Sequence, residues 1–392
     1  MLRSLFSGIS GLRSHQTMLD VTGNNIANVN TTGFKSSQVQ FQDTLSQMLM
    51  GAGGAQAGVG GTNPAQIGLG VRVAGVTTNF TQGASQMTGR STDMMIQGDG
   101  FFVVRKGNES YYTRAGSFDF DATGNMVLPG EGALVQGWMA VDGVIDTNGP
   151  ITDLKVPSGT VMAAVESTAA TYAGNLDSAA ADGTVLNRTI DLYSSTGEAR
   201  TLTLTFTKSS TGWAVAASDG SSSVASAAMT FDADGALTSP TSLTVGGVAV
   251  DLSTLTGFSG LDTVKATKQD GQAAGTLQSF SLGADGTITG AFSNGLKQVV
   301  GRIAIGGFTN PAGLEKAGGS LFRTTVNSGD ASIGTAGTGG RGSLAGGALE
   351  MSNVDLSSEF TSLIVAQRGF QANSRVITTS DEVLQELVNL KR

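Results

Sequence analysis

Hydrophobic residues at both ends of the chain recur at alternating spacings of three and four. Near the N-terminus this spacing falls on Leu2, Leu5, Ile9, Leu12, Leu19 and Ile26. Near the C-terminus it falls on Leu356, Phe360, Leu363, Phe370, Ile377, Leu384 and Val388. Such a narrow stripe indicates a helix that buries one side against another helix, as in a coiled coil. We therefore predict two terminal helices whose stripes are an assembly interface. The alternative is that the two helices only pair with each other and cap one domain.

The limits of these helices can be predicted from polar and glycine residues. The first helix should run from about Arg3 to Ala27, with Gly33 closing it. Asp355 can cap the start of the second helix, or Ser352 can do so with Asp355 three residues later. Residues 34–50 are predicted to be either more helix or a long irregular arm. Residues 51–61 are almost entirely Gly and Ala and are predicted to be a flexible or closely packed linker.

From Val71 onward the hydrophobic period changes to two, which predicts β-strands. We expect a hairpin in which 94–96 pairs with 101–104 around the turn Gly98-Asp99-Gly100. A second hairpin is expected within 118–127, and a third within 231–237. Residues 200–207 alternate apolar residues with threonine, which is typical of a half-buried antiparallel strand.

The composition shifts after Pro150 and returns to its earlier pattern from about Thr276, so the middle of the chain is predicted to be an insertion. The fold class expected is mainly β with terminal α-helices, arranged as nested, discontinuous domains. The predicted parts are a coiled-coil-like helical domain (1–33 with 352–392), an arm (34–70), a first β domain (71–150 with 275–351) and an inserted outer β domain (151–274).

Charge and cysteine content exclude several classes of function. Only 14% of the residues are charged, and the net charge of −8 argues against nucleic acid or an anionic membrane as a partner. The chain has no cysteine, which excludes disulfides and thiolate metal sites. We expect no cleaved signal peptide, because serines and glycines interrupt the N-terminal apolar residues, and no apolar run is long enough to cross a membrane.

No motif predicts an enzyme, so we expect no catalytic, cofactor-binding or metal-binding residues. His15 is the only histidine, and we expect a solvated or interface side chain there. Asp232-Ala-Asp234-Gly235 resembles half of a calcium loop but lacks the later bidentate glutamate. Gly98-Asp99-Gly100 lacks the spacing of a dinucleotide-binding loop and is followed by strand residues.

Three longer motifs carry a resemblance to a known family. The first is N-terminal: Ser7-Gly-Ile-Ser-Gly-Leu12, the run from Leu19 to Asn28, and Thr32-Gly-Phe-Lys35. The second comprises the run from Asp93 to Phe102 and Tyr112-Thr-Arg-Ala-Gly-Ser-Phe118. The third is the run from Gly347 to Leu356 with Ala366-Gln-Arg-Gly-Phe-Gln-Ala-Asn373. Together they resemble the signatures of the flagellar axial proteins, which comprise rod, hook and hook-associated proteins.

The resemblance implies a subunit that polymerises with itself into a helical tube. It also implies export through the flagellar type III apparatus without a cleaved signal, and a place in the extracellular flagellum attached to the basal body. The implied partners are rod, hook-cap and hook–filament junction proteins, with no cofactor and no membrane insertion. Within the family, the chain length and the large insertion are most similar to a hook subunit, with a distal rod or hook–filament junction subunit as the alternative. A secreted β-rich enzyme or adhesin is the other class considered.

Overall fold

The computed structural model describes residues 2–55, 58, 60–156 and 159–390. The chain forms two compact units. Unit 1 comprises residues 1–156, 281–289 and 299–392, and unit 2 comprises residues 157–280 and 290–298. Each is described by itself below. The prediction of a mainly β fold with paired terminal helices is confirmed.

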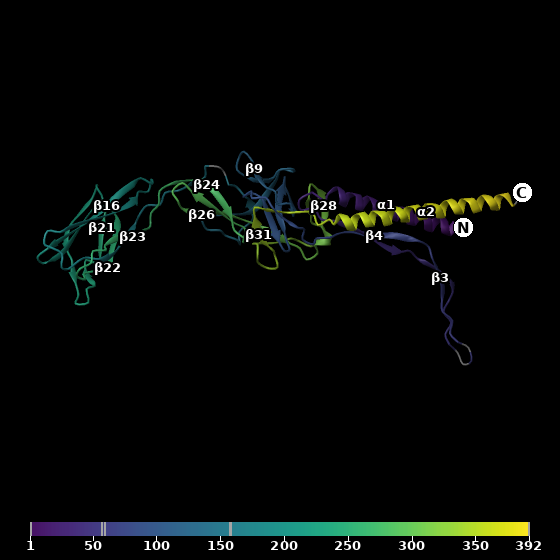
Figure 1. Ribbon diagram of the computed structural model, residues 1–392, viewed down its shortest axis with the longest axis horizontal. Coiled ribbons are helices and arrows are strands. Elements are labelled where there is room, and N and C mark those ends of the chain that lie inside the picture. The colour runs from purple at the N-terminus through teal and green to yellow at the C-terminus, as the bar shows by residue number, and fades with distance from the viewer. Residues whose placement is uncertain (1, 56–57, 59, 157–158, 391–392) are drawn as a thin grey trace. The chain divides into compact units, whose positions relative to one another are not determined.

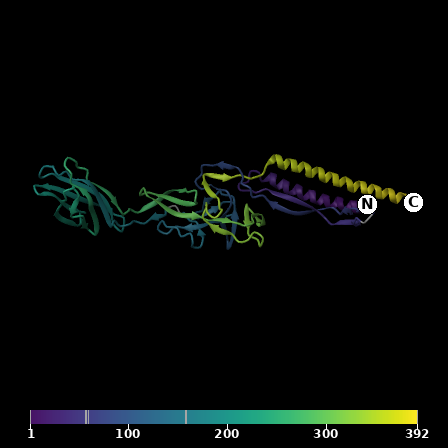
Figure 2. The ribbon, with the colours of Figure 1, turned by 90° about the horizontal axis from the view of Figure 1, so that it is seen from below.

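The two terminal helices of unit 1 are α1 (Leu2–Ala27) and α2 (Leu356–Asn389). They lie side by side, in purple and yellow in Figures 1 and 2, and pack against each other. The predicted cap is confirmed, because the Asp355 side chain accepts hydrogen bonds from the backbone N–H groups of Ser357 and Ser358. The negative charge of Asp355 also suits the positive end of the helix dipole.

Residues 34–50 contain two β-strands, so the prediction of more helix or an irregular segment there is wrong. β1 (Ser37–Asp43) pairs antiparallel with β4 (Val71–Thr78), and both contact α1. Farther out, β2 (Ser46–Met50) pairs with β3 (Ala65–Gly68). The predicted linker, residues 51–61, lies between these two strands in the sequence, and its residues 56, 57 and 59 are outside the described part of the structure. The apolar side chains at 41, 45 and 49 fit a helical period, but strand pairing with the segment after Gly70 determines the conformation.

The rest of unit 1 is a β body. Its strands before the insertion are β5 (Ser85–Met87), β6 (Met94–Gln97), β7 (Phe101–Lys106), β8 (Glu109–Thr113), β9 (Asp119–Phe120), β10 (Met126–Leu128), β11 (Ala133–Met139) and β12 (Thr152–Asp153). Those after it are β27 (Ile305–Gly307), β28 (Glu315–Gly318), β29 (Leu321–Arg323), β30 (Ser332–Gly334), β31 (Ser343–Gly346) and β32 (Ala348–Glu350), with a 3-10 turn, η1 (Pro311–Gly313).

Strand β7 is the centre of this body. It pairs with β8, β11 and β27, and its side chains are almost all buried. Phe101 packs edge-to-face against aromatic rings from distant segments, Phe80, Phe308 and Phe322. A strand buried on both faces explains the continuous apolar run Phe101–Val104, because both pleat directions face the core.

The strands on either side of Gly98-Asp99-Gly100 exist, but the predicted pairing between them is wrong. β6 pairs with β31, from the later part of the chain, and not with β7. Gly98 and Gly100 both have positive φ, and this conformation carries the chain from one sheet to another. The other two predicted hairpins are confirmed, because β9 pairs with β10 and β19 (Thr230–Phe231) pairs with β20 (Leu237–Ser239).

Unit 2 contains two four-stranded sheets around one hydrophobic core. The first sheet consists of β15 (Val185–Tyr193), β16 (Ala199–Ser209), β17 (Gly212–Ser218) and β18 (Ser223–Ala228). The second consists of β21 (Ser242–Val245), β22 (Val248–Thr256), β14 (Ala169–Asn175) and β23 (Lys265–Gln269). The short β13 (Val161–Met162) pairs with β24 (Gly275–Leu282). β24, β25 (Thr287–Phe292) and β26 (Lys297–Ile303) each contain residues assigned to both units.

The predicted alternating strand within 200–207 is confirmed in β16. Its leucines and Phe206 are fully buried in the core of unit 2, and its threonines lie on the other face, where they are half-buried except for the exposed Thr201. Trp213 of the neighbouring strand β17 lies in the same core, and its indole N–H donates to the carbonyl of Asp177. The indole is thus fixed inside the core with its polar atom satisfied.

Candidate assembly surfaces and junction

The contact between α1 and α2 is made by small residues. A Cβ atom at Gly11 would lie 2.6 Å from the Asn373 side chain, and one at Gly369 would lie 2.5 Å from the His15 ring. At Gly8 it would meet Ile377 at 3.3 Å. His15 is thus an interface side chain within the subunit, half-buried between the helices and near the ring of Phe41. Glycine allows the two backbones to approach closely, which larger residues would prevent.

The predicted stripe on α1 lies beside this contact rather than at its centre. Leu5, Ile9, Leu12, Leu19 and Ile26 are each half-buried, and the side chain of Leu2 lies outside the described part of the structure. The buried positions of α1 lie one to three places from these residues: Gly8, Gly11, Ser14, Thr22 and Asn25. The apolar stripe therefore keeps part of its surface free in a single subunit.

On α2 the predicted residues divide into two groups. Leu363, Ile377 and Leu384 are half-buried, whereas Leu356, Phe360, Phe370 and Val388 are exposed. Ala366 is the buried residue at the centre of the contact. Some of the predicted stripe thus faces the interior of the subunit, and the rest is turned away from it.

A second apolar stripe on α2 escaped the sequence analysis. It comprises Val365, Ala372, Val376, Val383, Leu387 and Leu390. These positions lie three, four or seven residues apart, so the helical repeat places them on one side of α2. All are exposed, and Val365 keeps 54% of its surface free. We refer to these six residues as the outer stripe. Val376 also touches α1, because it lies 3.7 Å from a Cβ atom built at Gly8. A row of apolar side chains that stays mostly exposed in the subunit is typical of a helix that packs on another chain.

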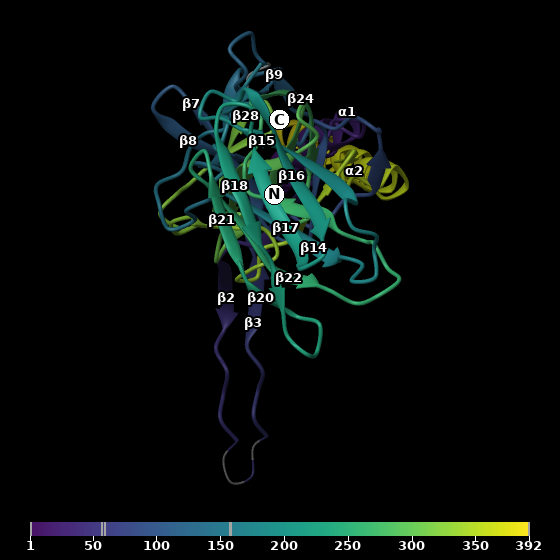
Figure 3. The same cartoon turned by 90° about the vertical axis from the view of Figure 1, so that its left-hand side faces the viewer.

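The β2–β3 hairpin is also apolar and exposed. Leu45 is 85% exposed, and Met48, Leu49 and Met50 are each about 60% exposed. From Thr44 to Gly70 the chain has no charged residue. Figure 3 shows the hairpin projecting away from the rest of unit 1. An isolated two-stranded hairpin is only marginally stable in water. A group of exposed apolar side chains on such a hairpin indicates a surface that binds another molecule.

Where the helices join the β body, buried polar side chains tie three segments together. Asn25, which is 1% exposed, donates to the Ser37 carbonyl at 2.8 Å and to Glu359 Oε1 at 2.9 Å, so it joins α1, β1 and α2. Asn353 acts similarly, accepting from the Ser36 N–H at 2.8 Å and donating to the Asn79 carbonyl at 2.8 Å. These two side-chain amides thereby satisfy backbone hydrogen-bonding groups of the segments that meet at the junction.

The junction also holds a buried ionic cluster of Lys35, Glu350 and Arg114. Lys35 Nζ lies 2.7 Å from Glu350 Oε1, and both side chains are completely buried. Arg114 Nη1 lies 3.4 Å from Glu350 Oε2 and is nearly as buried. Burial lowers the pKa of Lys35, and the hydrogen bond from Lys35 to Glu350 opposes this. Burial likewise lowers the pKa of Arg114.

Glycine lets the N-terminal segment reach this cluster. Gly33 has φ +67°, and its N–H donates to the Glu350 carbonyl at 2.8 Å. A Cβ atom at Gly33 would lie 2.5 Å from the Ala115 nitrogen. The segment carrying Lys35 therefore lies directly against the backbone of the β body. Sequence reasoning could not find the cluster, because its three members are far apart in the chain.

Comparisons with known proteins match three separate segments. Residues 5–35 match the family "Flagella basal body rod protein", 95–173 the "Flagellar hook protein FlgE/F/G D1 domain", and 345–390 the "Flagellar basal body rod FlgEFG protein C-terminal". The chain is also 39% identical to the flagellar hook protein FlgE of Treponema pallidum over the whole length of both chains. The chain belongs to the flagellar hook and rod protein family.

Other members show the same relationship. The flagellar basal-body rod protein FlgG of Bacillus subtilis is 36% identical, again over the whole of both chains. The crystal structure of the Helicobacter pylori hook protein FlgE2 has a TM-score of 0.50 and 17% identity, and the match covers 66% of this chain and 98% of that one. That likeness supports the fold. The ionic cluster at the junction takes one residue from each matched segment: Lys35 from the first, Arg114 from the second and Glu350 from the third.

The hook and rod family is a family of structural proteins. Across the described ranges, no three His, Cys, Asp or Glu side chains are grouped closely enough to hold a metal ion. No helix in the described part of the chain has the length and apolarity needed to cross a membrane. Membership of the family places the chain in the flagellum, as part of a polymeric structure.

Proposed function

We propose that the chain is a structural subunit of the bacterial flagellar hook, which assembles with itself into a helical tube. The observation that carries the proposal is the presence of two largely exposed apolar surfaces, the outer stripe of α2 and the β2–β3 hairpin, on one subunit. Neither surface resembles the other, so contacts between copies are heterologous. Contacts of this type produce rings where the rotation between copies closes, and open helical polymers where it does not. The proposal is the open polymer.

The tube would act as a flexible joint between the rod and the filament. The chain's similarity to hook proteins over their whole length supports this position. Its neighbours would be the rod, the hook cap and the hook–filament junction proteins, and it would reach the cell exterior through the type III export apparatus. A distal rod or hook–filament junction subunit could use the same two surfaces, but in a different position and with a different stiffness.

In a free subunit we propose that the terminal helices are largely unfolded and that they fold on assembly. The buried residues of the two helices are small or polar, and the large apolar residues at the contact, such as Ile377, are only half-buried. Ala366 is the fully buried residue of α2. Such a contact contributes little hydrophobic stabilisation. Ordering the backbone of the helices costs about 1–2 kcal/mol of conformational entropy per residue, which this contact does not offset. Packing of the outer stripe on neighbouring copies would supply the rest.

The predicted division into four parts is retained within this proposal. The helical domain (1–33 with 352–392) and the arm (34–70) would form the inner part of the tube. The first β domain (71–150 with 275–351) would lie outside them, and the insertion (151–274) would lie outermost. The separate core of unit 2, built around Phe206 and Trp213, supports an insertion that folds by itself.

Replacing Val365 by Asp should abolish tube formation. Val365 lies in the outer stripe and is 54% exposed, so the subunit itself tolerates a carboxylate there. In the tube the same carboxylate would be buried without a partner, which costs several kcal/mol. Electron microscopy of the purified full-length chain at increasing concentration should show tubes for the wild type and none for Val365→Asp.

The matched control is Gln367→Asp, two residues away and on another side of α2. It should assemble like the wild type. A wild-type chain that forms no tube at any concentration would contradict the proposed function. Tubes formed by Val365→Asp would exclude the outer stripe from the interface.

A lysine in the β2–β3 hairpin should also weaken assembly. Leu49→Lys places a charge in a segment that has none, and if that segment is buried between copies the critical concentration should rise about tenfold or more. The rise can be measured by sedimentation. Val326→Lys is the control, because Val326 is fully exposed and stands on a loop of the β body. Equal effects of the two substitutions would mean that the hairpin makes no specific contact.

A further inference from the structure

Glu350 is a single buried carboxylate that faces two buried cations. Its Oε1 atom accepts from Lys35 Nζ at 2.7 Å and from the Gly83 N–H at 2.8 Å. Arg114 reaches only Oε2, at 3.4 Å, and Arg114 Nε has no hydrogen-bond partner. Arginine is suited to a two-pronged bond with a carboxylate, and here it makes one long bond. With the N-terminal segment packed on the β body, Arg114 therefore makes fewer hydrogen bonds to Glu350 than its guanidinium group could make.

The two cations come from different parts of unit 1. Arg114 follows β8, and Glu350 ends β32, so both belong to the β body. Lys35 belongs to the segment between α1 and β1, which is held by the Gly33 and Ser36 backbone contacts. With Lys35 present, the buried group has two cations and one carboxylate. Without it, Arg114 and Glu350 alone would be a neutral pair.

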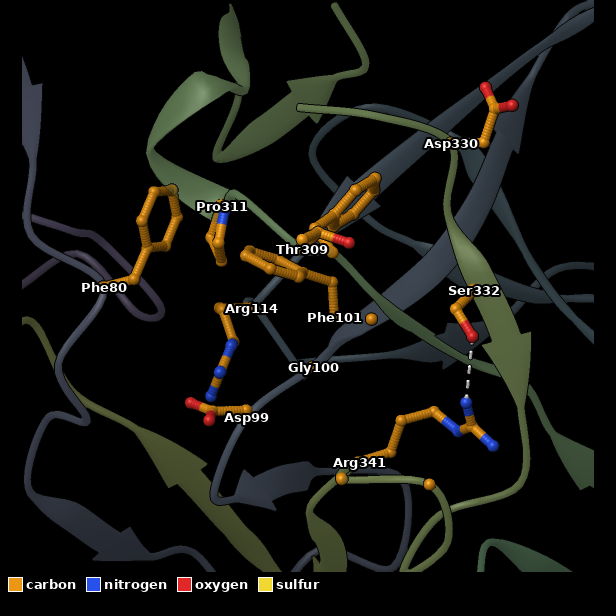
Figure 4. Close-up of a pocket in the computed structure, with 14 residues that line it drawn as sticks. Phe80, Asp99, Gly100, Phe101, Arg114, Thr309, Pro311, Asp330, Ser332 and Arg341 are labelled. Carbon is orange, nitrogen blue, oxygen red and sulfur yellow. Dashed lines mark hydrogen bonds between the residues drawn. The ribbon is translucent and has the colours of Figure 1, made fainter. Parts of the chain in front are cut away.

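Arg114 is not packed tightly on every side, although Glu350 does not line the open space next to it. Arg114 borders a cavity of about 430 Å³, whose walls include Phe80, Phe101 and Pro311. Figure 4 shows the Arg114 side chain between these rings, with its guanidinium group directed toward Asp99. Its guanidinium carbon lies 5.2 Å from the centre of the Phe101 ring, a contact that a small sliding motion preserves. A shift of well under 1 Å would bring the Arg114–Glu350 distance into the normal range.

We propose that Glu350 changes its main cation on assembly: Arg114 alone binds it closely in the free subunit, and when the N-terminal segment docks Lys35 takes the short contact while Arg114 keeps only the long one. This inference rests on the proposed function, because it requires that the terminal segments are unfolded before assembly. A buried carboxylate without a cation is strongly destabilising. Arg114 removes that cost in the free subunit, so the β body stays folded while the ends are loose.

The exchange predicts opposite effects for two substitutions in the full-length chain. Lys35→Met should leave the thermal midpoint of the dilute subunit unchanged and should raise the critical concentration for tubes about tenfold or more. Arg114→Met should lower that midpoint by several degrees, because Glu350 then has no cation. It should not raise the critical concentration, because Lys35 supplies the cation in the tube. Lys106→Met, which breaks a surface pair with Glu131, is the control and should change neither quantity.

Hydrogen exchange of the dilute wild-type subunit separates the two proposals. Fast exchange throughout residues 2–43 is expected. Protection there would contradict folding on assembly, and the cation exchange with it. If exchange is fast but Lys35→Met and Arg114→Met destabilise the dilute subunit equally, folding on assembly stands and the cation exchange is wrong. If Lys35→Met and Arg114→Met raise the critical concentration equally, the cation exchange is also wrong. Should Arg114→Met fail to fold, Arg114→Lys retains the charge, loses the two-pronged bond and is judged by the same two measurements.

Discussion

Replacing Gly33 by Val is expected to abolish assembly while leaving the β body folded. Gly33 has φ +67°, a conformation that costs a β-branched residue about 1–3 kcal/mol. A Cβ atom there would also lie 2.5 Å from the Ala115 nitrogen and 2.6 Å from the Arg114 carbonyl carbon, and these backbone atoms cannot move aside easily. The N-terminal segment would then fail to dock, and α1 would not reach α2. Electron microscopy should show no tubes, and the thermal midpoint of the β body should be unchanged.

A second glycine separates backbone strain from the clash. Gly107 has φ +64°, and nothing lies within 4 Å of a Cβ atom built on it. Gly107→Val therefore introduces the strain without the collision, and it should reduce the stability of the β body slightly while tubes still form. Normal tubes from Gly33→Val would show that docking of this segment is unnecessary for assembly.

Replacing Glu350 by Ala should have the largest effect on the folded chain. The substitution leaves Arg114, and in the docked state Lys35 also, buried without a carboxylate, and it removes the acceptor of the Gly83 N–H. Breaking a buried ion pair from one side costs on the order of 3–5 kcal/mol. Urea denaturation followed by circular dichroism should show a midpoint far below that of the wild type.

Glu315→Ala is the matched control for this measurement. Glu315 pairs with Arg323 at 2.8 Å, but both side chains are about half exposed. Surface pairs of this kind contribute roughly 0–1 kcal/mol, so the control should unfold close to the wild-type midpoint. A similar loss from Glu315→Ala and Glu350→Ala would mean that the junction cluster has no special role in stability.

Hydrophobic period alone predicted the two terminal helices and many of the strands. A hydrophobic period shows which side chains of a segment are buried, but it does not show which other strand or helix buries them. For this reason β6 and β7 were predicted as strands correctly, whereas β6 pairs with β31, almost 250 residues away in the chain. The arm was ambiguous for a related reason, because Phe41, Leu45 and Leu49 fit a helical spacing as well as a strand.

The assembly surfaces were only partly predictable. The predicted stripes consist of large apolar residues, but the observed contact of α1 with α2 uses Gly8, Gly11 and Gly369, which no hydrophobic pattern detects. The outer stripe was missed because Gly369 and Thr379 interrupt it in the sequence. Lys35, Arg114 and Glu350 are ordinary charged residues until the fold brings them together. Which of the exposed residues lie between copies stays a prediction.

The lack of charge between Thr44 and Gly70 has a consequence for the medium in which the protein works. A contact made by Leu45, Met48 and Leu49 involves no ion pair that dissolved salt could screen. Hydrophobic contacts are strengthened, not weakened, by salts such as sulfate. If the hairpin binds neighbouring copies, this part of the polymer should keep its strength from dilute fresh water to concentrated brine. A structure exposed directly to the surroundings of the cell would then need no adjustment when their ionic strength changes.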